Sequence, residues 1–201
     1  MSGAAPVRPD LPGMRALLEG ARALDDPYGA VLEISLLALA LPWEAVSIDL
    51  ERIDWSRAEV RVPARGGRFR TLALPNAALQ SILRIAGSAG GRGQAVTAGR
   101  GRRLSHRGVR LDRLQERLAE VSPSSSRVHW NFHGIRAAAT DLLTASGVRA
   151  EDASAIFGFG RDAAGADDPR RAAFQRERAS FAVERWTRLL LDDGRRASPA
   201  R

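Results

Sequence analysis

Cysteine and lysine are both absent from the 201-residue sequence, so that all 31 basic residues are arginine. Without cysteine the chain can form no disulfide, no thiolate nucleophile and no cysteine-based metal site. The three histidines, His106, His129 and His133, lack the spacing of metal ligands, and we expect neither a metal nor another cofactor. Tyrosine occurs once, as Tyr28.

Long hydrophobic runs are also missing. The most apolar stretch, "YGAVLEISLLALAL", is interrupted by Glu33 and is shorter than the roughly 20 residues that a membrane span needs. The N-terminus has no basic segment followed by an apolar one, as a signal peptide would have. These absences predict a cytoplasmic protein that has no membrane as a partner.

Acidic residues are too few to balance the arginines. The formal net charge is +8 and the pI about 11.4, so a polyanionic partner is expected. Alanine, glycine and arginine are abundant throughout, and a compositional bias is therefore an alternative explanation of the charge. The hydrophobic content of 44% is typical of a globular domain with a core.

One folded domain is expected over residues 14–192. Residues 1–13 are small, proline-rich and aperiodic, and residues 193–201 are polar, so both ends are predicted to be flexible. Within the domain the periodicity is mostly helical, and the last helix carries Trp186. Asp26 should cap a buried central helix that starts at Pro27.

A single β-hairpin interrupts the helical pattern. Val60 and Val62 alternate before a Gly-Gly turn, and Leu72 and Leu74 alternate after it. The tip of this hairpin is predicted to carry three arginines: Arg65, Arg68 and Arg70. Residues 87–103 form a glycine-rich basic loop. Further helices are expected over 14–24, 76–86, 105–121, 131–146 and 151–157.

This order of elements, over about residues 25–186, resembles the catalytic domain of the tyrosine recombinases, the phage integrase family. "SLLALALPWEAVSIDLERIDW" and the hairpin resemble the family's first helical block, with its acidic position at Glu44. "FHGIRAAATDLLTASGVRAEDASAIFGFG" resembles the family's His-x-x-Arg helix and the Gly-His turn after it. The resemblance implies an α+β fold, mainly α with a small β-hairpin, in which residues 14–192 form an integrase catalytic-like domain.

The chemistry of the family requires a fixed set of groups. A tyrosine attacks the scissile phosphate, and two arginines and a histidine hold its oxygens. A lysine on the hairpin protonates the leaving oxygen, and a second histidine or tryptophan assists. At the matching positions, only His133 and Arg136 correspond to the family's pattern.

The other positions of that set differ. Leu41 stands where the first arginine belongs, Arg65 where the lysine belongs and Phe159 where the second histidine belongs. Arginine keeps its proton too tightly to act as the acid. No tyrosine lies near residues 168–171, where the nucleophile belongs, and Tyr28 is far upstream. His133 and Arg136 are thus interpreted as remnants of a catalytic site rather than as an active one.

Six arginines are candidate DNA-binding residues: Arg65, Arg68 and Arg70 at the hairpin tip, Arg102 and Arg103 in the basic loop, and Arg136. An ordinary solvated turn and a mobile charged loop are the alternatives for the first two groups. The alternative for His133 is a helix-start residue that packs on its neighbours. No aromatic residue is interleaved with the basic loop, so stacking of single-stranded bases is not predicted there.

Three functions remain open on the sequence alone. The first is a catalytically inactive, recombinase-like protein that binds duplex DNA and partners an intact recombinase or a second copy of itself. The second is an active recombinase subunit that takes its nucleophile from a partner. The third is an interaction-only remnant whose charge is compositional.

Overall fold

A computed structural model describes residues 8–63, 69–88, 93–98, 102–104, 110–122, 128, 130–157 and 169–192. In this part of the chain the fold is α+β, as predicted, with helices around a small antiparallel sheet. The helices are α1 (Leu11–Ala23), α2 (Pro27–Ala38), α3 (Pro42–Val46), the 3-10 helix η1 (Leu50–Arg52), α4 (Asn76–Ser88), α5 (Leu111–Val121), α7 (Phe132–Ala145), α8 (Ala150–Ala155) and α9 (Pro169–Leu191). The strands are β1 (Ile53–Asp54), β2 (Glu59–Pro63), β3 (Phe69–Ala73), β4 (Thr97–Ala98) and β5 (Arg102–Arg103).

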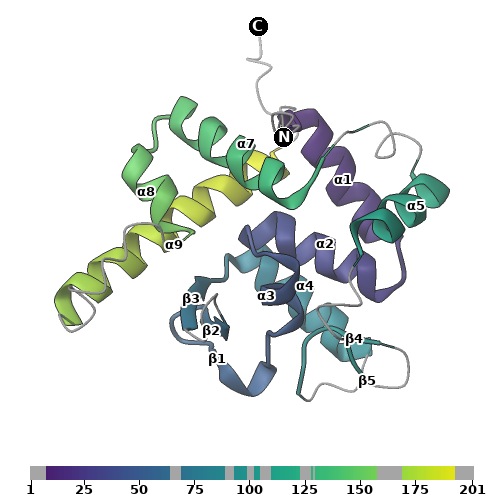
Figure 1. Ribbon diagram of the computed structural model, residues 1–201. Coiled ribbons are helices and arrows are strands. Elements are labelled where there is room, and N and C mark those ends of the chain that lie inside the picture. Colours follow the sequence, from purple (N-terminus) through teal and green to yellow (C-terminus); the bar gives the residue numbers. More distant parts are fainter. Residues whose placement is uncertain are drawn as a thin grey trace, which may run out of the picture.

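Helix α2 lies at the centre of the domain, as its apolar sequence predicts. The Asp26 side chain caps it by accepting hydrogen bonds from the Tyr28 and Gly29 amides, and every residue from Gly29 to Ala38 is buried. Helices α1, α5, α7 and α8 lie on one side of α2, while α3, α4 and the sheet lie on the other (Figure 1). A helix that is apolar on all faces requires such surroundings.

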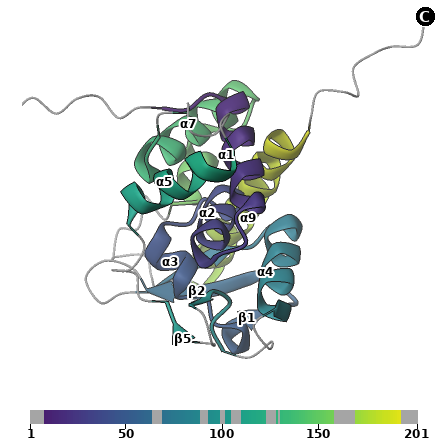
Figure 2. The ribbon, with the colours of Figure 1, turned by 90° about the vertical axis from the view of Figure 1, so that its right-hand side faces the viewer.

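Helix α9 runs along the length of the molecule and packs against α2 (Figures 1 and 2). The fully buried Trp186 anchors it, because the indole Nε1 donates a hydrogen bond to the Leu36 carbonyl at 2.7 Å. At its end, the Arg15 guanidinium of α1 donates to the Leu189 carbonyl at 2.8 Å and to that of Leu190 at 3.1 Å. These bonds satisfy carbonyls that a helix C-terminus leaves without a partner.

The predicted hairpin is present as β2 and β3, with Val60 opposite Leu72. β1 adds a third strand, paired with β2. Exposure alternates along β3, so that Arg70 and Leu72 face the core while Phe69 faces solvent. The hairpin therefore has an inner face that belongs to the core and an outer face that is exposed.

Three local expectations are corrected. Part of the segment predicted as a loop forms a short ladder, β4 with β5, and α5 begins at Leu111 instead of near Ser105. Ser105 itself lies outside the described residues. Helix α1 starts at Leu11, before the predicted Met14, because Asp10 caps it. Within the described chain, no helix combines the length and the apolarity needed to cross a membrane.

Candidate phosphate-binding site

The first turns of α7 carry the His-x-x-Arg motif. The Asn131 side chain accepts a hydrogen bond from the Gly134 amide at 2.7 Å, and this N-cap sets where the helix begins. His133 is exposed, whereas Arg136, one turn further along the same side of the helix, is partly buried. The helix ends as predicted at Gly147, whose φ of +88° favours glycine.

Arg136 is held by an aromatic ring. Its guanidinium carbon lies 4.2 Å from the centroid of the Phe157 ring, at the end of α8. Among the described residues, no carboxylate or carbonyl accepts a hydrogen bond from this guanidinium. Burial and the nearby charge of Arg70 lower the pKa of Arg136 to about 10, although Glu44 acts in the opposite direction. The side chain thus presents a partly desolvated cation whose hydrogen-bond donors find no acceptor among the described residues.

A buried ion pair lies beside Arg136. Arg70 of β3 is 5% exposed, and its Nε and Nη2 donate to the two carboxylate oxygens of Glu44, the latter bond measuring 2.6 Å. Its Nη1 donates to the Ile156 carbonyl at 2.8 Å. Arg70 therefore connects α3, β3 and the end of α8, and it positions the backbone next to Phe157.

Leu41 belongs to the same cluster. It precedes α3, is 8% exposed, and its amide donates to the Glu44 carboxylate at 2.7 Å. This position, which the resemblance assigns to the first arginine, is therefore apolar and adjacent to the ion pair. Because Arg70 neutralises Glu44, the uncompensated positive charge of the cluster is that of Arg136.

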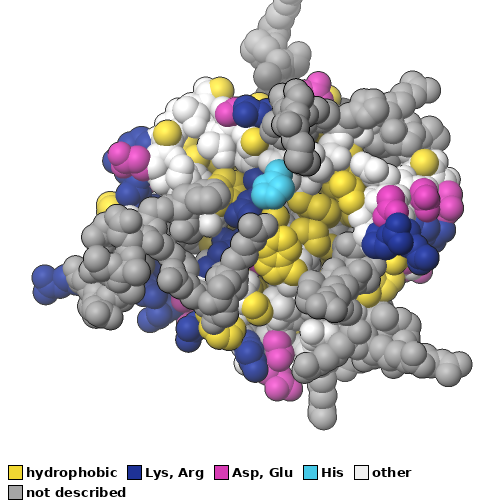
Figure 3. Space-filling model, in the orientation of Figure 1, with side chains coloured by type: hydrophobic (Ala, Val, Ile, Leu, Met, Phe, Trp, Pro, Cys, Tyr) yellow, Lys and Arg dark blue, Asp and Glu magenta, His cyan; other side chains and the backbone are white. Residues whose placement is uncertain are grey.

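The exposed face of this site combines charge with apolar surface. Figure 3 shows the described histidine side chain, coloured cyan, next to arginine side chains and to a patch of hydrophobic ones. Trp130 and Phe132 pack edge to face just before and within the start of α7, with ring centroids 5.4 Å apart. In the described part of the chain, no cluster of histidine and carboxylate side chains is arranged to hold a metal ion.

The structure corrects the predicted position of Arg70. The sequence interpretation placed it at an exposed hairpin tip, but it lies on the inner face of the sheet and its guanidinium is occupied by Glu44 and Ile156. The alternation of side chains along a strand could have indicated that Arg70 faces inward. Leu72 and Leu74 are the alternating apolar residues of the predicted strand, and a residue two positions before Leu72 points to the same side of the sheet.

The other predicted residues are only partly described. Several of them lie outside the described residues: Arg65 and Arg68 at the hairpin tip, and Phe159 and position 168 between α8 and α9. The backbones of Arg102 and Arg103 form β5, which pairs with β4. Tyr28 is partly buried in the first turn of α2. Of the candidate residues, the described structure thus brings Arg136, Arg70 and Leu41 into one cluster around Glu44.

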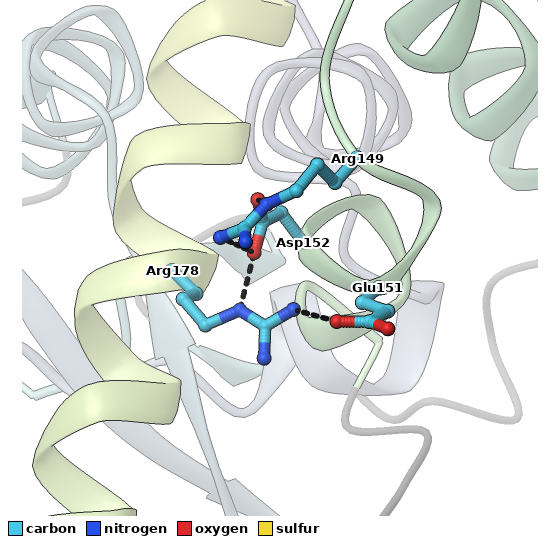
Figure 4. A network of polar contacts seen from close by, with 4 residues as sticks. All are labelled: Arg149, Glu151, Asp152 and Arg178. Atoms are coloured by element: carbon cyan, nitrogen blue, oxygen red, sulfur yellow. Dashed lines mark hydrogen bonds and ion pairs between the residues drawn. The ribbon is translucent and has the colours of Figure 1, made fainter.

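An ion-pair network that the sequence did not indicate fastens α8 to α9 (Figure 4). The buried Asp152 accepts hydrogen bonds from Arg178 of α9 and from the Arg149 Nε at 2.9 Å, while Arg178 also donates to Glu151 at 3.0 Å. Burial acts to raise the pKa of Asp152, but the two arginines outweigh it and hold that pKa below its ordinary value. The network holds α8 in place, and Phe157 lies two residues after the end of that helix.

Comparisons with solved structures agree with this architecture. An integrase from mycobacterium phage Brujita superposes with a TM-score of 0.64 at 16% identity, covering 94% of this chain and 63% of the integrase chain. XerA recombinase superposes with a TM-score of 0.58 at 14% identity, covering 87% of this chain and 66% of the recombinase chain. The chain has a tyrosine recombinase-like fold and spans somewhat less than two thirds of the length of either chain.

Comparisons of sequence give no match. No protein-family model matches the chain, and no curated protein matches it. The similarity is therefore one of fold, and any binding or catalytic activity depends on the residues of the site.

Proposed function

We propose that this protein binds duplex DNA through the phosphate backbone, with Arg136 as the central contact, and that it does not cleave the DNA. The observation that carries the proposal is the Arg136 guanidinium, which is partly desolvated, stacked on Phe157 and without an acceptor among the described residues. A cation in this setting gains most from an anion that completes its hydrogen bonds.

The surroundings of Arg136 support a phosphate as that anion. The Arg70–Glu44 pair is neutral as a unit, so the cluster carries one net positive charge, which matches the single negative charge of a phosphodiester. The net charge of +8 adds a long-range attraction to the same polyanion. His133, exposed one turn before Arg136, provides a further group on the approach to the site.

The groups that phosphoryl transfer needs are missing from this chain at several positions. Leu41 offers no hydrogen-bond donor from its side chain, and no tyrosine occurs after Tyr28. Binding a phosphate requires one well-placed cation, whereas transferring it requires several cations and a nucleophile at once. Binding without cleavage is the function that the remaining residues support. A role as a partner of an intact recombinase extends the same proposal.

The proposal is tested by the salt dependence of DNA binding. Fluorescence anisotropy with a labelled duplex should give dissociation constants in the range of about 10⁻⁴ to 10⁻⁶ M near physiological salt, with little sequence preference. The log–log salt slope should be roughly −0.9 for each neutralised phosphate. Arg136→Gln should weaken binding by about 10-fold or more on all sequences and flatten the slope by about one unit.

A matched control separates the site from net charge. Arg185 is exposed on α9, and Arg185→Gln removes the same charge elsewhere. It should change affinity by much less than Arg136→Gln does. If the two variants lose affinity equally, the binding is a property of the overall charge and not of this site. If the wild-type protein does not bind DNA at low salt, the interaction-only function replaces the proposal.

A further inference from the structure

The outer face of the hairpin carries an exposed aromatic side chain beside an arginine. Phe69, the first residue of β3, is 49% exposed. On the neighbouring strand, Pro63 lies directly opposite it, and the guanidinium carbon of Arg61 lies 5.5 Å from the centroid of the ring. Both of these β2 residues are also exposed.

A single exposed aromatic residue on a protein surface needs no functional explanation, so the distinguishing feature is the charge of its neighbour. Within the described chain, no carboxylate lies within ion-pair distance of Arg61. Phe174 of α9 offers a comparison: it is 53% exposed, and Arg178 lies 5.3 Å from its ring centroid. Arg178, however, is neutralised by Asp152 and Glu151.

The two aromatic–arginine pairs therefore differ electrostatically. At Phe174 the cation is already paired and 13% exposed, whereas at Phe69 it is exposed and available to an anion. An aromatic ring flanked by proline and by an uncompensated cation is suited to a flat ring attached to a phosphate.

We propose that Phe69 and Arg61 form a stacking site for an unpaired DNA base, with the base on the Phe69 ring and its phosphate near Arg61. The site is separate from the phosphate site of Arg136, because Phe69 faces away from Arg70 across the sheet. It rests on the proposed function only in taking DNA as the partner. Its effect is a preference for DNA that contains a displaced base over a fully paired duplex.

The test compares a matched duplex with the same duplex carrying a short internal bulge labelled with 2-aminopurine. Stacking of one base on an aromatic side chain contributes about 1–3 kcal/mol, which is about fivefold to 150-fold in affinity. The wild-type protein should bind the bulged duplex at least about fivefold more tightly and should change the 2-aminopurine fluorescence. Phe69→Ala should abolish both effects and leave the affinity for the matched duplex unchanged. Phe69→Trp should retain them.

Phe174→Ala is the matched control, since it removes an equally exposed ring whose arginine is neutralised. It should preserve the preference for the bulge. Equal binding of the two duplexes, or an equal loss in both alanine variants, would overturn the stacking site while the Arg136 site stands. Absence of binding to either duplex would overturn both proposals. Arg136→Gln should weaken both duplexes by the same factor, and a selective loss on the bulged duplex would contradict two separate sites.

Discussion

Arg136 is a residue whose environment opposes its charge. Partial burial and the neighbouring Arg70 disfavour the protonated form and lower the pKa to about 10, and Phe157 compensates only in part. A side chain selected for stability at this position would be apolar. The unfavourable cation is understandable if it binds an anion, because functional sites commonly lower stability.

Arg136→Met should consequently stabilise the free protein. The lowered pKa corresponds to at most about 3 kcal/mol, and loss of the cation–π contact offsets part of it, so the free energy of unfolding should rise by about 1 to 2 kcal/mol at pH 7. Because the folded pKa lies below the unfolded value, the full penalty on the wild-type protein is present below about pH 10 and diminishes as the pH rises above that value towards the unfolded pKa.

Urea unfolding of both proteins at neutral pH and above pH 10 measures this difference. The gap between them should shrink at the higher pH. A variant that is less stable than the wild-type protein at pH 7 would show that Arg136 has a structural role that the described contacts do not contain.

At the scale of elements, α8 is too short to be stable by itself, and its ion pairs hold it in place. Helices of this length lack the hydrogen bonds needed to repay nucleation. Its buried carboxylate Asp152 joins Arg149 to Arg178 of the long helix α9. Since Phe157 lies only two residues after α8, the same contacts help to determine the position of the Phe157 ring against Arg136.

Asp152→Asn should lower the free energy of unfolding by about 2 to 3 kcal/mol, because two arginines lose their shared carboxylate in a partly buried setting. The pKa of Asp152 is lowered in the folded state, so its contribution is present above the ordinary value of 3.8 and is lost as the pH falls through the lower folded value. Denaturant unfolding between pH 3 and 7 measures it.

The wild-type protein should approach the stability of the Asp152→Asn variant only at acid pH. Glu151→Gln provides the control, since Glu151 is exposed and pairs with the same Arg178. Glu151→Gln should lower the free energy of unfolding by less than about 1 kcal/mol. Equal effects of the two changes would mean that burial of Asp152 contributes nothing.

At the scale of the whole molecule, the proposed phosphate site is assembled from α3, β3, α7 and the turn that follows α8. Each provides one part, namely Glu44, Arg70, Arg136 and Phe157. A catalytic phosphoryl-transfer site built this way would act as a unit, so that restoring one missing group would restore little activity.

Leu41→Arg should therefore not create a DNA-cleaving protein. Arg70 already occupies both oxygens of Glu44, so a third arginine in this buried position would find its partner taken and would repel Arg136. A nicked duplex incubated with the wild-type or the Leu41→Arg protein should give no covalent protein–DNA species after denaturation. A covalent species with the wild-type chain would establish an active subunit and contradict the proposal. The variant should also unfold at lower denaturant concentration.

The sequence determined the local features of this fold. The apolar pattern and the caps predicted α2, the hairpin, α7 and the end of α7 at Gly147, because periodicity and capping depend on neighbours within a few residues. The resemblance in the motifs around His133 led to the correct fold at 16% identity or less to the solved structures. The alternation of apolar residues along β3 could also have placed Arg70 on the inner face, since residues two apart in a strand point to the same side of the sheet.

Only the tertiary structure decided what these side chains contact. Arg70 meets Glu44 across 26 positions of sequence and Ile156 across 86, and no local pattern specifies such pairs. The partial burial that lowers the pKa of Arg136, the ring of Phe157 beneath it and the neutralisation of Arg178 by α8 likewise arise from the packing of distant elements. The sequence gives the number and positions of the charged residues. Whether a cation is neutralised by a carboxylate or remains able to bind an anion depends on which groups the fold brings within a few ångströms of it.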